Sequence, residues 1–125
     1  MMFLWVALGG AIGASGRYAL SLLLPVAQGT FPWATWWANI IGCICAGVFF
    51  AASERFVSLQ GEWRLFLMVG ILGGFTTFSS FGLESFQLLK LGHYGLVLSY
   101  VLSSVLVGIC ALALGYYGFR AFIFQ

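Results

Sequence analysis

Charged side chains are scarce in this sequence, and their scarcity excludes several classes of protein. They make up 6% of the 125 residues, as five Lys or Arg and three Asp or Glu. The net charge of +2 is too small to indicate nucleic-acid binding. The three cysteines, Cys43, Cys45 and Cys110, lack the number and spacing of a disulfide framework or a metal site. The sequence contains no nucleotide-binding loop and no nucleophile with a paired base, so we expect no enzymatic activity.

Apolar side chains are abundant instead. They make up 62% of the chain, and its mean hydropathy is +1.07. A helix needs about 20 mostly apolar residues to cross the hydrocarbon core of a bilayer, so the chain has room for four such helices. The N-terminus begins hydrophobic without a basic region, which favours a first membrane span over a cleaved signal peptide. We therefore expect a multi-pass protein of the cell inner (plasma) membrane, folded as a single four-helix transmembrane domain over residues 1–125.

Four hydrophobic segments are separated by short polar connections. The segments run from about Met2 to Leu24, Trp33 to Ser53, Trp63 to Leu89 and Tyr94 to Tyr117. Tryptophans at the start of the second and third segments are typical of the membrane–water interface. The sequence thus predicts an all-α integral membrane protein.

The third segment contains a stretch, Gly70–Phe81, that is poorly suited to a regular helix. Its paired glycines, Gly73 and Gly74, weaken the helix because glycine costs about 1 kcal/mol relative to alanine. Threonines and serines follow, interleaved with phenylalanines. Irregular polar backbone inside a membrane must be enclosed by protein or face water. The stretch therefore predicts a helix that is broken near Gly73–Thr77 and carries a functional site at the break.

Helical spacing sorts the residues after this break into two stripes. Phe78 and Phe81 are three residues apart and share a face. Beside them lies a polar stripe, made of Thr77, Ser80, Glu84 and Gln87. Lipid disfavours such a stripe, so it must face protein or water. Ring edges and hydroxyls would suit a small anion, although ordinary packing is the simpler interpretation in a chain with 13 phenylalanines.

Two further polar residues lie within predicted spans, and each allows two interpretations. Arg17, in the first span, is either an anchor near the helix end or part of a vestibule that attracts anions. Asn39, in the second span, either makes an interhelical hydrogen bond or directs its amide N–H into a pore. From spacing alone, the interhelical hydrogen bond is favoured.

The break also frees backbone oxygens. The carbonyls of Gly73 and Thr76 are expected to have lost their helical partners, and unwound carbonyls in broken transport helices commonly hold cations. If two inverted copies of the chain met there, four carbonyls would converge on one axis. Such a set fits a buried Na⁺ at a dimer interface.

The distribution of basic residues is nearly even across the membrane. Arg55, Arg64 and Arg120 lie on one side, and Lys90, with Arg17 if it reaches that far, on the other. This weak bias permits insertion in both orientations. The chain could therefore form an antiparallel dimer with an inverted copy of itself.

Three motifs in this order resemble the Fluc (CrcB) fluoride channel family: Gly9–Tyr18, Asn39–Gly42 and Gly73–Phe81. The resemblance implies a dual-topology antiparallel homodimer with two fluoride pores and a central Na⁺ held by the carbonyls of Gly73 and Thr76. It also assigns groups to the anion pathway, namely Asn39, Thr77, Phe78, Ser80, Phe81, Tyr100 and Ser104, with Glu84 matching a family glutamate. Two positions depart from the family pattern: Ser80 replaces a common Thr, and Gly108 replaces a serine.

The implied function is passive, selective export of fluoride, which relieves fluoride toxicity. The alternative is a proton-coupled exporter like the small multidrug-resistance proteins, which typically need a carboxylate in the first span. Here that span has none, and Glu84 is the only candidate within any span. A structural membrane subunit, the third alternative, would need neither the broken helix nor the two stripes.

Overall fold

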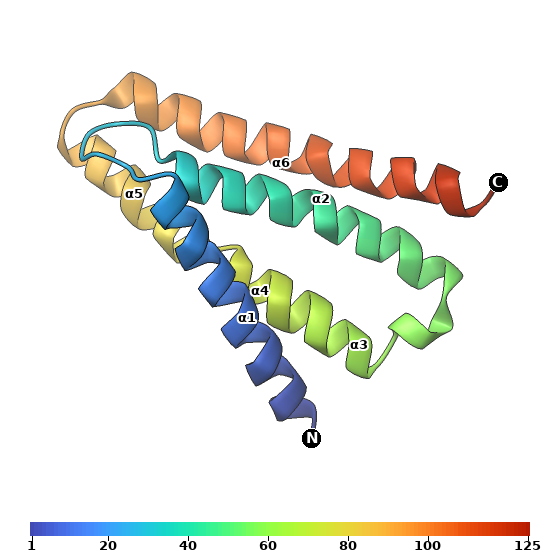
Figure 1. The fold of residues 1–125 in the computed structure, drawn as a ribbon. Helices are drawn as coiled ribbons and strands as arrows, with labels where there is room; N and C mark the ends of the chain where they lie inside the picture. Colours follow the sequence, from blue (N-terminus) through green and yellow to red (C-terminus); the bar gives the residue numbers. More distant parts are fainter.

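The structure, a computed structural model, describes residues 1–125 and is entirely helical (Figure 1). Its elements are α1 (Met2–Leu23), α2 (Trp33–Arg55), the 3₁₀ turn η1 (Val57–Leu59), α3 (Glu62–Arg64), the π-helix η2 (Leu65–Leu72), α4 (Gly73–Phe75), α5 (Phe78–Lys90) and α6 (Tyr94–Ile123). Four helical segments are long and apolar enough to cross a membrane: α1, α2, the joined segment Glu62–Lys90, and α6. The prediction of an all-α protein with four candidate spans is confirmed.

Helices α2 and α6 lie side by side along much of their length (Figure 1). Glycines permit this close approach: a Cβ atom on Gly47 would collide with the carbonyl oxygen of Leu112, and one on Gly115 with that of Ile44. Small residues at a membrane helix interface allow backbones to come close enough for dispersion to hold them. The α2–α6 pair thus forms a rigid support beside the broken third span.

Helix α1 crosses η2 and α4, the first half of the third span (Figure 1). Gly9 and Gly13 face that half directly, since a Cβ on either would collide with the backbone oxygen of Phe66 or Ile71. The close packing expected from this G-x-x-x-G pair is therefore present.

The third span is broken at its two threonines. Thr76 (φ −84°, ψ 155°) and Thr77 (φ −152°, ψ 125°) are extended, and α5 starts immediately after them. Gly73 and Gly74, expected to weaken the helix, are instead helical within α4. Gly74 packs so closely on α1 that an added Cβ would lie 2.6 Å from the carbonyl oxygen of Gly10. Gly74 therefore serves the contact with α1, and the threonines make the break.

Two helices extend further than the sequence predicted. Helix α6 continues to Ile123, so Arg120 lies in its last turn rather than in a separate C-terminal end, and α2 continues to Arg55. Basic side chains in the last turn interact favourably with the helix dipole. The guanidinium of Arg120 also lies over the ring of Phe124, 5.3 Å from its centroid, a cation–π contact that supports the extra turn.

Candidate functional site

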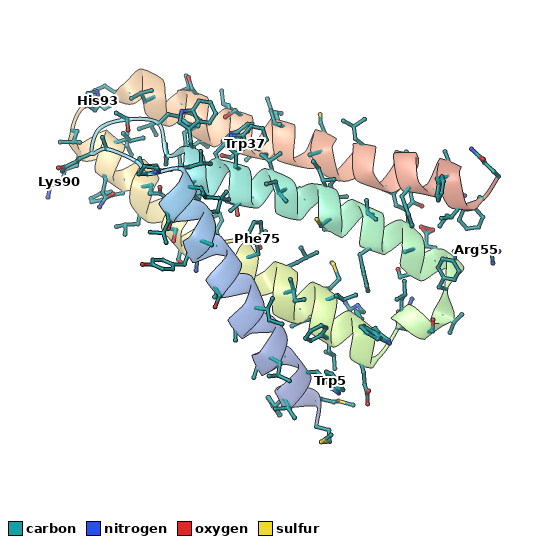
Figure 2. The ribbon with its side chains drawn as sticks, viewed as in Figure 1. Trp5, Trp37, Arg55, Phe75, Lys90 and His93 are labelled. Atoms are coloured by element: carbon teal, nitrogen blue, oxygen red, sulfur yellow. The ribbon has the colours of Figure 1, made fainter.

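A hollow of about 430 Å³ lies beside the break in the third span. Residues predicted from the sequence line much of it: Asn39, Gly73, Thr76, Thr77, Phe78, Phe81 and Ser104. They come from α2, the broken span and α6, and Figure 2 shows the break, marked by Phe75, between α1 and α2. The fold thus brings groups from three spans to one place.

Asn39 is joined to the break by two hydrogen bonds. The backbone N–H of Thr77 donates to Asn39 Oδ1 at 2.9 Å, and Asn39 Nδ2 donates to the carbonyl oxygen of Thr77 at 3.2 Å. The Asn39 side chain therefore satisfies both the N–H and the carbonyl of Thr77. Because Thr77 is extended, these two groups lack helical partners. The interhelical hydrogen bond expected from spacing is present, and Asn39 also lines the hollow.

The start of α5 has a side-chain cap. The backbone N–H of Ser80 donates to Thr77 Oγ1 at 3.2 Å, the usual role of a threonine at a helix N-cap. This cap and the Asn39 contact use the two N–H groups that would otherwise bond Gly73 and Thr76 in a continuous helix. No N–H group donates to the carbonyl oxygen of either residue. Gly73 and Thr76 both line the hollow. Carbonyl oxygens without hydrogen bonds are the kind of ligand that can hold a Na⁺ ion.

Aromatic rings form a continuous series from the hollow into the protein. The ring centroids of Phe78 and Phe81 are 5.7 Å apart, and those of Phe81 and Tyr100 are 5.0 Å apart. Phe78 is 83% exposed, whereas Tyr100 is fully buried. The hydroxyls of Tyr100 and Ser104 are buried without a hydrogen-bond partner. Unpaired buried hydroxyls are uncommon, and here they lie on α6 where the sequence predicted pore-side groups.

Glu84 faces α2 across a second hollow of about 290 Å³, which Ser80 and Thr35 also line. Its carboxylate accepts a hydrogen bond of 2.6 Å from Thr35 Oγ1. The polar stripe of α5 therefore faces protein rather than lipid along the stretch from Ser80 to Glu84.

Arg17 reaches from α1 to the broken span. Its Nε atom donates to the carbonyl oxygen of Gly74 at 3.4 Å, and the side chain borders a third hollow of about 260 Å³ with Ser21 and Thr35. Arg17 thus contacts the broken span, and its role in a vestibule stays a prediction.

Comparison with known proteins gives the family. The family described as CrcB-like protein, Camphor Resistance (CrcB), matches residues 4–116. The chain belongs to this family. Three curated relatives each carry the name "Fluoride-specific ion channel FluC".

The three relatives each align with most of this chain. The protein of Phocaeicola vulgatus is 45% identical over 114 residues, which cover 90% of this chain and 93% of the relative. That of Leptospira interrogans is 46% identical over 107 residues, covering 85% and 84%. That of Helicobacter pylori strain G27 is 39% identical over 125 residues, covering 98% and 95%.

The sequence did not identify Thr35 as part of the site, nor the interhelical hydrogen bond of Ser103, which borders none of the hollows described above. Thr35 bonds Glu84, and Ser103 accepts a hydrogen bond of 2.9 Å from Trp36 Nε1. The spacing contained a signal for Thr35, which lies four residues before Asn39 and so on the same face of α2. Helical spacing gave no such indication for Ser103, because its hydrogen-bond partner, Trp36, lies on another helix.

Gly108 of the CrcB-like chain lies in the contact between α2 and α6. It is buried, and a Cβ there would lie 3.4 Å from Cys43 Sγ and 3.8 Å from Ile40 Cδ1. These are ordinary van der Waals distances, so the packing of α2 on α6 leaves room for a β-carbon at this position.

Proposed function

We propose that this chain is a passive, highly selective fluoride channel that exports fluoride down its electrochemical gradient and so relieves fluoride toxicity. The observation that carries the proposal is the clustering of polar groups and ring edges around the hollow at the break. Membership of the CrcB-like family and the name carried by the relatives support it. The chain would work as a single four-helix domain, residues 1–125, in the inner membrane.

The groups around the break match the chemistry of a small, hard anion. The Asn39 amide can donate one hydrogen bond beyond the one it gives to Thr77, since an amide nitrogen carries two hydrogens. The positive edges of Phe78 and Phe81 can approach an anion. Hydroxyls along the path, on Thr77, Ser80, Tyr100 and Ser104, can replace water of hydration. Weak, successive sites of this kind let an ion leave as well as bind, which conduction requires.

Charged groups at the ends of this path would have different roles. Arg17, at the break and beside a hollow, would raise the local concentration of anions. Glu84 would position Thr35 at the second hollow, because its carboxylate accepts the Thr35 hydroxyl. The membrane potential would drive export, because moving one charge across 100 mV changes the free energy by about 2.3 kcal/mol.

The pore is proposed to form between two copies of the chain. Phe78 is 83% exposed on a single chain, next to free carbonyls in the middle of a span. Polar backbone at that depth must be covered by protein or line a water-filled cavity. An inverted second copy would cover it, and the even distribution of basic residues permits that orientation. The assembly would be an antiparallel homodimer with two pores.

The carbonyls of Gly73 and Thr76 are proposed to hold a structural Na⁺ at the dimer interface. Both oxygens are free of hydrogen bonds, and two copies would supply four of them. The ion would neutralise the converging carbonyl dipoles and thereby stabilise the junction. Replacing Na⁺ by a large organic cation should shift the monomer–dimer equilibrium toward monomer, as read by cross-linking or mass photometry.

The test of the proposed function is ion efflux from proteoliposomes that contain the purified chain. We expect fast fluoride efflux when a K⁺ gradient with valinomycin sets the potential, even when the proton gradient is abolished. Efflux that required a proton gradient would support a proton-coupled exporter instead, and no efflux would exclude a channel.

A further inference from the structure

A second, unrelated feature lies at the other end of the third span. Trp5 of α1, Glu62 and Trp63 of α3, and Phe66 of η2 enclose a hollow of about 180 Å³. Figure 2 shows Trp5 near the N-terminus, far along α1 from the break that Phe75 marks. We call this feature the aromatic box. None of its residues lines the hollows at the break.

The rings are arranged as walls around one central ring. Trp5 and Phe66 have centroids 6.0 Å apart and planes at 77°, and Trp63 and Phe66 have centroids 6.4 Å apart and planes at 74°. Both indoles are therefore nearly perpendicular to the Phe66 ring. Aromatic faces carry negative potential and attract cations within about 6 Å of their centroid. Cages of aromatic rings recognise ammonium ligands, including quaternary ones such as choline, so the carboxylate beside this box must provide any preference for a primary ammonium.

Two polar groups of the box have no partner in the chain. Of the three carboxylates, Glu84 accepts a hydrogen bond from Thr35 and Glu54 accepts one from Tyr116, which leaves the exposed Glu62 unpaired. The indole N–H of Trp5 is buried and has no acceptor. A buried indole N–H usually has a partner. The box therefore provides the Glu62 carboxylate for a cationic group of a ligand and the Trp5 N–H for a hydrogen-bond acceptor of the same ligand.

The box lies where a phospholipid headgroup would be. Glu62 and Trp63 begin the third candidate span, and Trp63 is 55% exposed. Tryptophans at span ends lie at the level of the headgroups. A ligand that combines an ammonium with a phosphate oxygen would meet the unpaired groups of both Glu62 and Trp5.

We propose that the aromatic box binds the phosphoethanolamine headgroup of a phospholipid. The primary ammonium lies against the rings of the box and donates to the Glu62 carboxylate, and a phosphate oxygen accepts the Trp5 N–H. Ethanolamine is favoured over choline because a primary ammonium has three donors for a carboxylate, whereas a trimethylammonium has none. Phosphatidylglycerol lacks the cation altogether.

Native mass spectrometry of the full chain tests the proposal by counting retained lipids. The protein is equilibrated with equal amounts of phosphatidylethanolamine, phosphatidylcholine and phosphatidylglycerol of identical acyl chains. The variants Glu62→Gln and Trp63→Leu are compared with matched controls, Glu54→Gln and Trp33→Leu, which change an exposed carboxylate and an exposed tryptophan outside the box. We expect preferential retention of phosphatidylethanolamine. Each box variant should weaken it about two- to fivefold, as for loss of one exposed cation–π contact in Trp63→Leu or one exposed ion pair in Glu62→Gln, and neither control should change it.

A second arm separates the lipid from a free cation. Soluble ethanolamine or tetramethylammonium, at a concentration equal to that of the lipid, should not displace the lipid, because neither carries the phosphate. Equal retention of the three lipids by the unaltered chain, or equal loss in box and control variants, would overturn the proposal. So would saturation of the box by the free cations. Fluoride efflux measured on the same variants shows that they are folded, and it is independent of whether the box binds lipid.

Discussion

Asn39 and Thr77 exchange two hydrogen bonds across the interface between α2 and the broken third span. The Asn39 side chain donates to the carbonyl of Thr77 and accepts from its N–H, at 3.2 Å and 2.9 Å. One side chain thus holds the extended residue between α4 and α5 in place. Helix α5, which carries the proposed anion-path groups Phe78, Ser80 and Phe81, begins immediately after Thr77. The Asn39–Thr77 pair therefore sets where these groups lie.

Replacing Asn39 by Ala should remove both the support of the break and an anion donor. The typical net contribution of a hydrogen bond is about 0.5–1.5 kcal/mol, and the two that are lost here are partly buried. We therefore expect a lower unfolding temperature together with strongly reduced fluoride efflux. Thermal unfolding followed by circular dichroism and efflux from proteoliposomes measure the two effects. Full efflux by a stable Asn39→Ala protein would show that neither role is needed.

The N-cap of α5 can be tested with two substitutions of Thr77, one that removes the hydroxyl and one that keeps it. Thr77→Val keeps the shape of the side chain but removes the hydroxyl that accepts the N–H of Ser80. We expect a loss of about 0.5–2 kcal/mol in stability, the range for loss of an N-cap. Thr77→Ser retains the hydroxyl and should stay close to the original stability. If Thr77→Ser lost as much stability as Thr77→Val, the methyl group rather than the cap would be responsible.

The ring edges at the hollow should matter for flux more than for assembly. Phe78→Ala and Phe81→Ala should each reduce fluoride efflux while the proposed dimer, measured by size-exclusion chromatography with light scattering, persists. Phe86→Ala is a matched control on the same helix, since Phe86 is 61% exposed and does not line the hollow. Normal efflux in both site variants would leave the rings with a packing role only.

Gly13 and Gly10 provide a matched pair for the contact between α1 and the third span. A Cβ on Gly13 would collide with the carbonyl of Ile71, whereas a Cβ on Gly10 would meet nothing within 4 Å. We expect Gly13→Ala to lower the unfolding temperature and Gly10→Ala to leave it unchanged or raise it, because alanine favours a helix by about 1 kcal/mol. Equal effects of the two substitutions would contradict the close packing of α1 on η2.

The position of the site could be predicted from the sequence because polar groups are out of place in a membrane span. Asn39, Thr77 and Ser80 each needed protein or water around them, and helical spacing placed Phe78 and Phe81 on one face. Their partners could not be predicted in the same way. Spacing tells which face a residue occupies but not which helix that face meets.

The break falls within the predicted stretch Gly73–Thr77, at its C-terminal end. Glycine weakens an isolated helix, yet Gly73 and Gly74 are both helical in the structure. Helix α1 packs directly on Gly74, where a larger residue would prevent the contact. The interruption falls instead at Thr76 and Thr77, where hydroxyls and Asn39 can satisfy the backbone.

The most direct test of the central claim is the reversal potential of current through the reconstituted protein in a planar bilayer. With a tenfold fluoride gradient and an opposing tenfold chloride gradient, a fluoride-selective path should reverse near the fluoride equilibrium potential, about 59 mV from zero. A reversal potential near zero, or one displaced by the same amount toward the chloride equilibrium potential, would contradict the account.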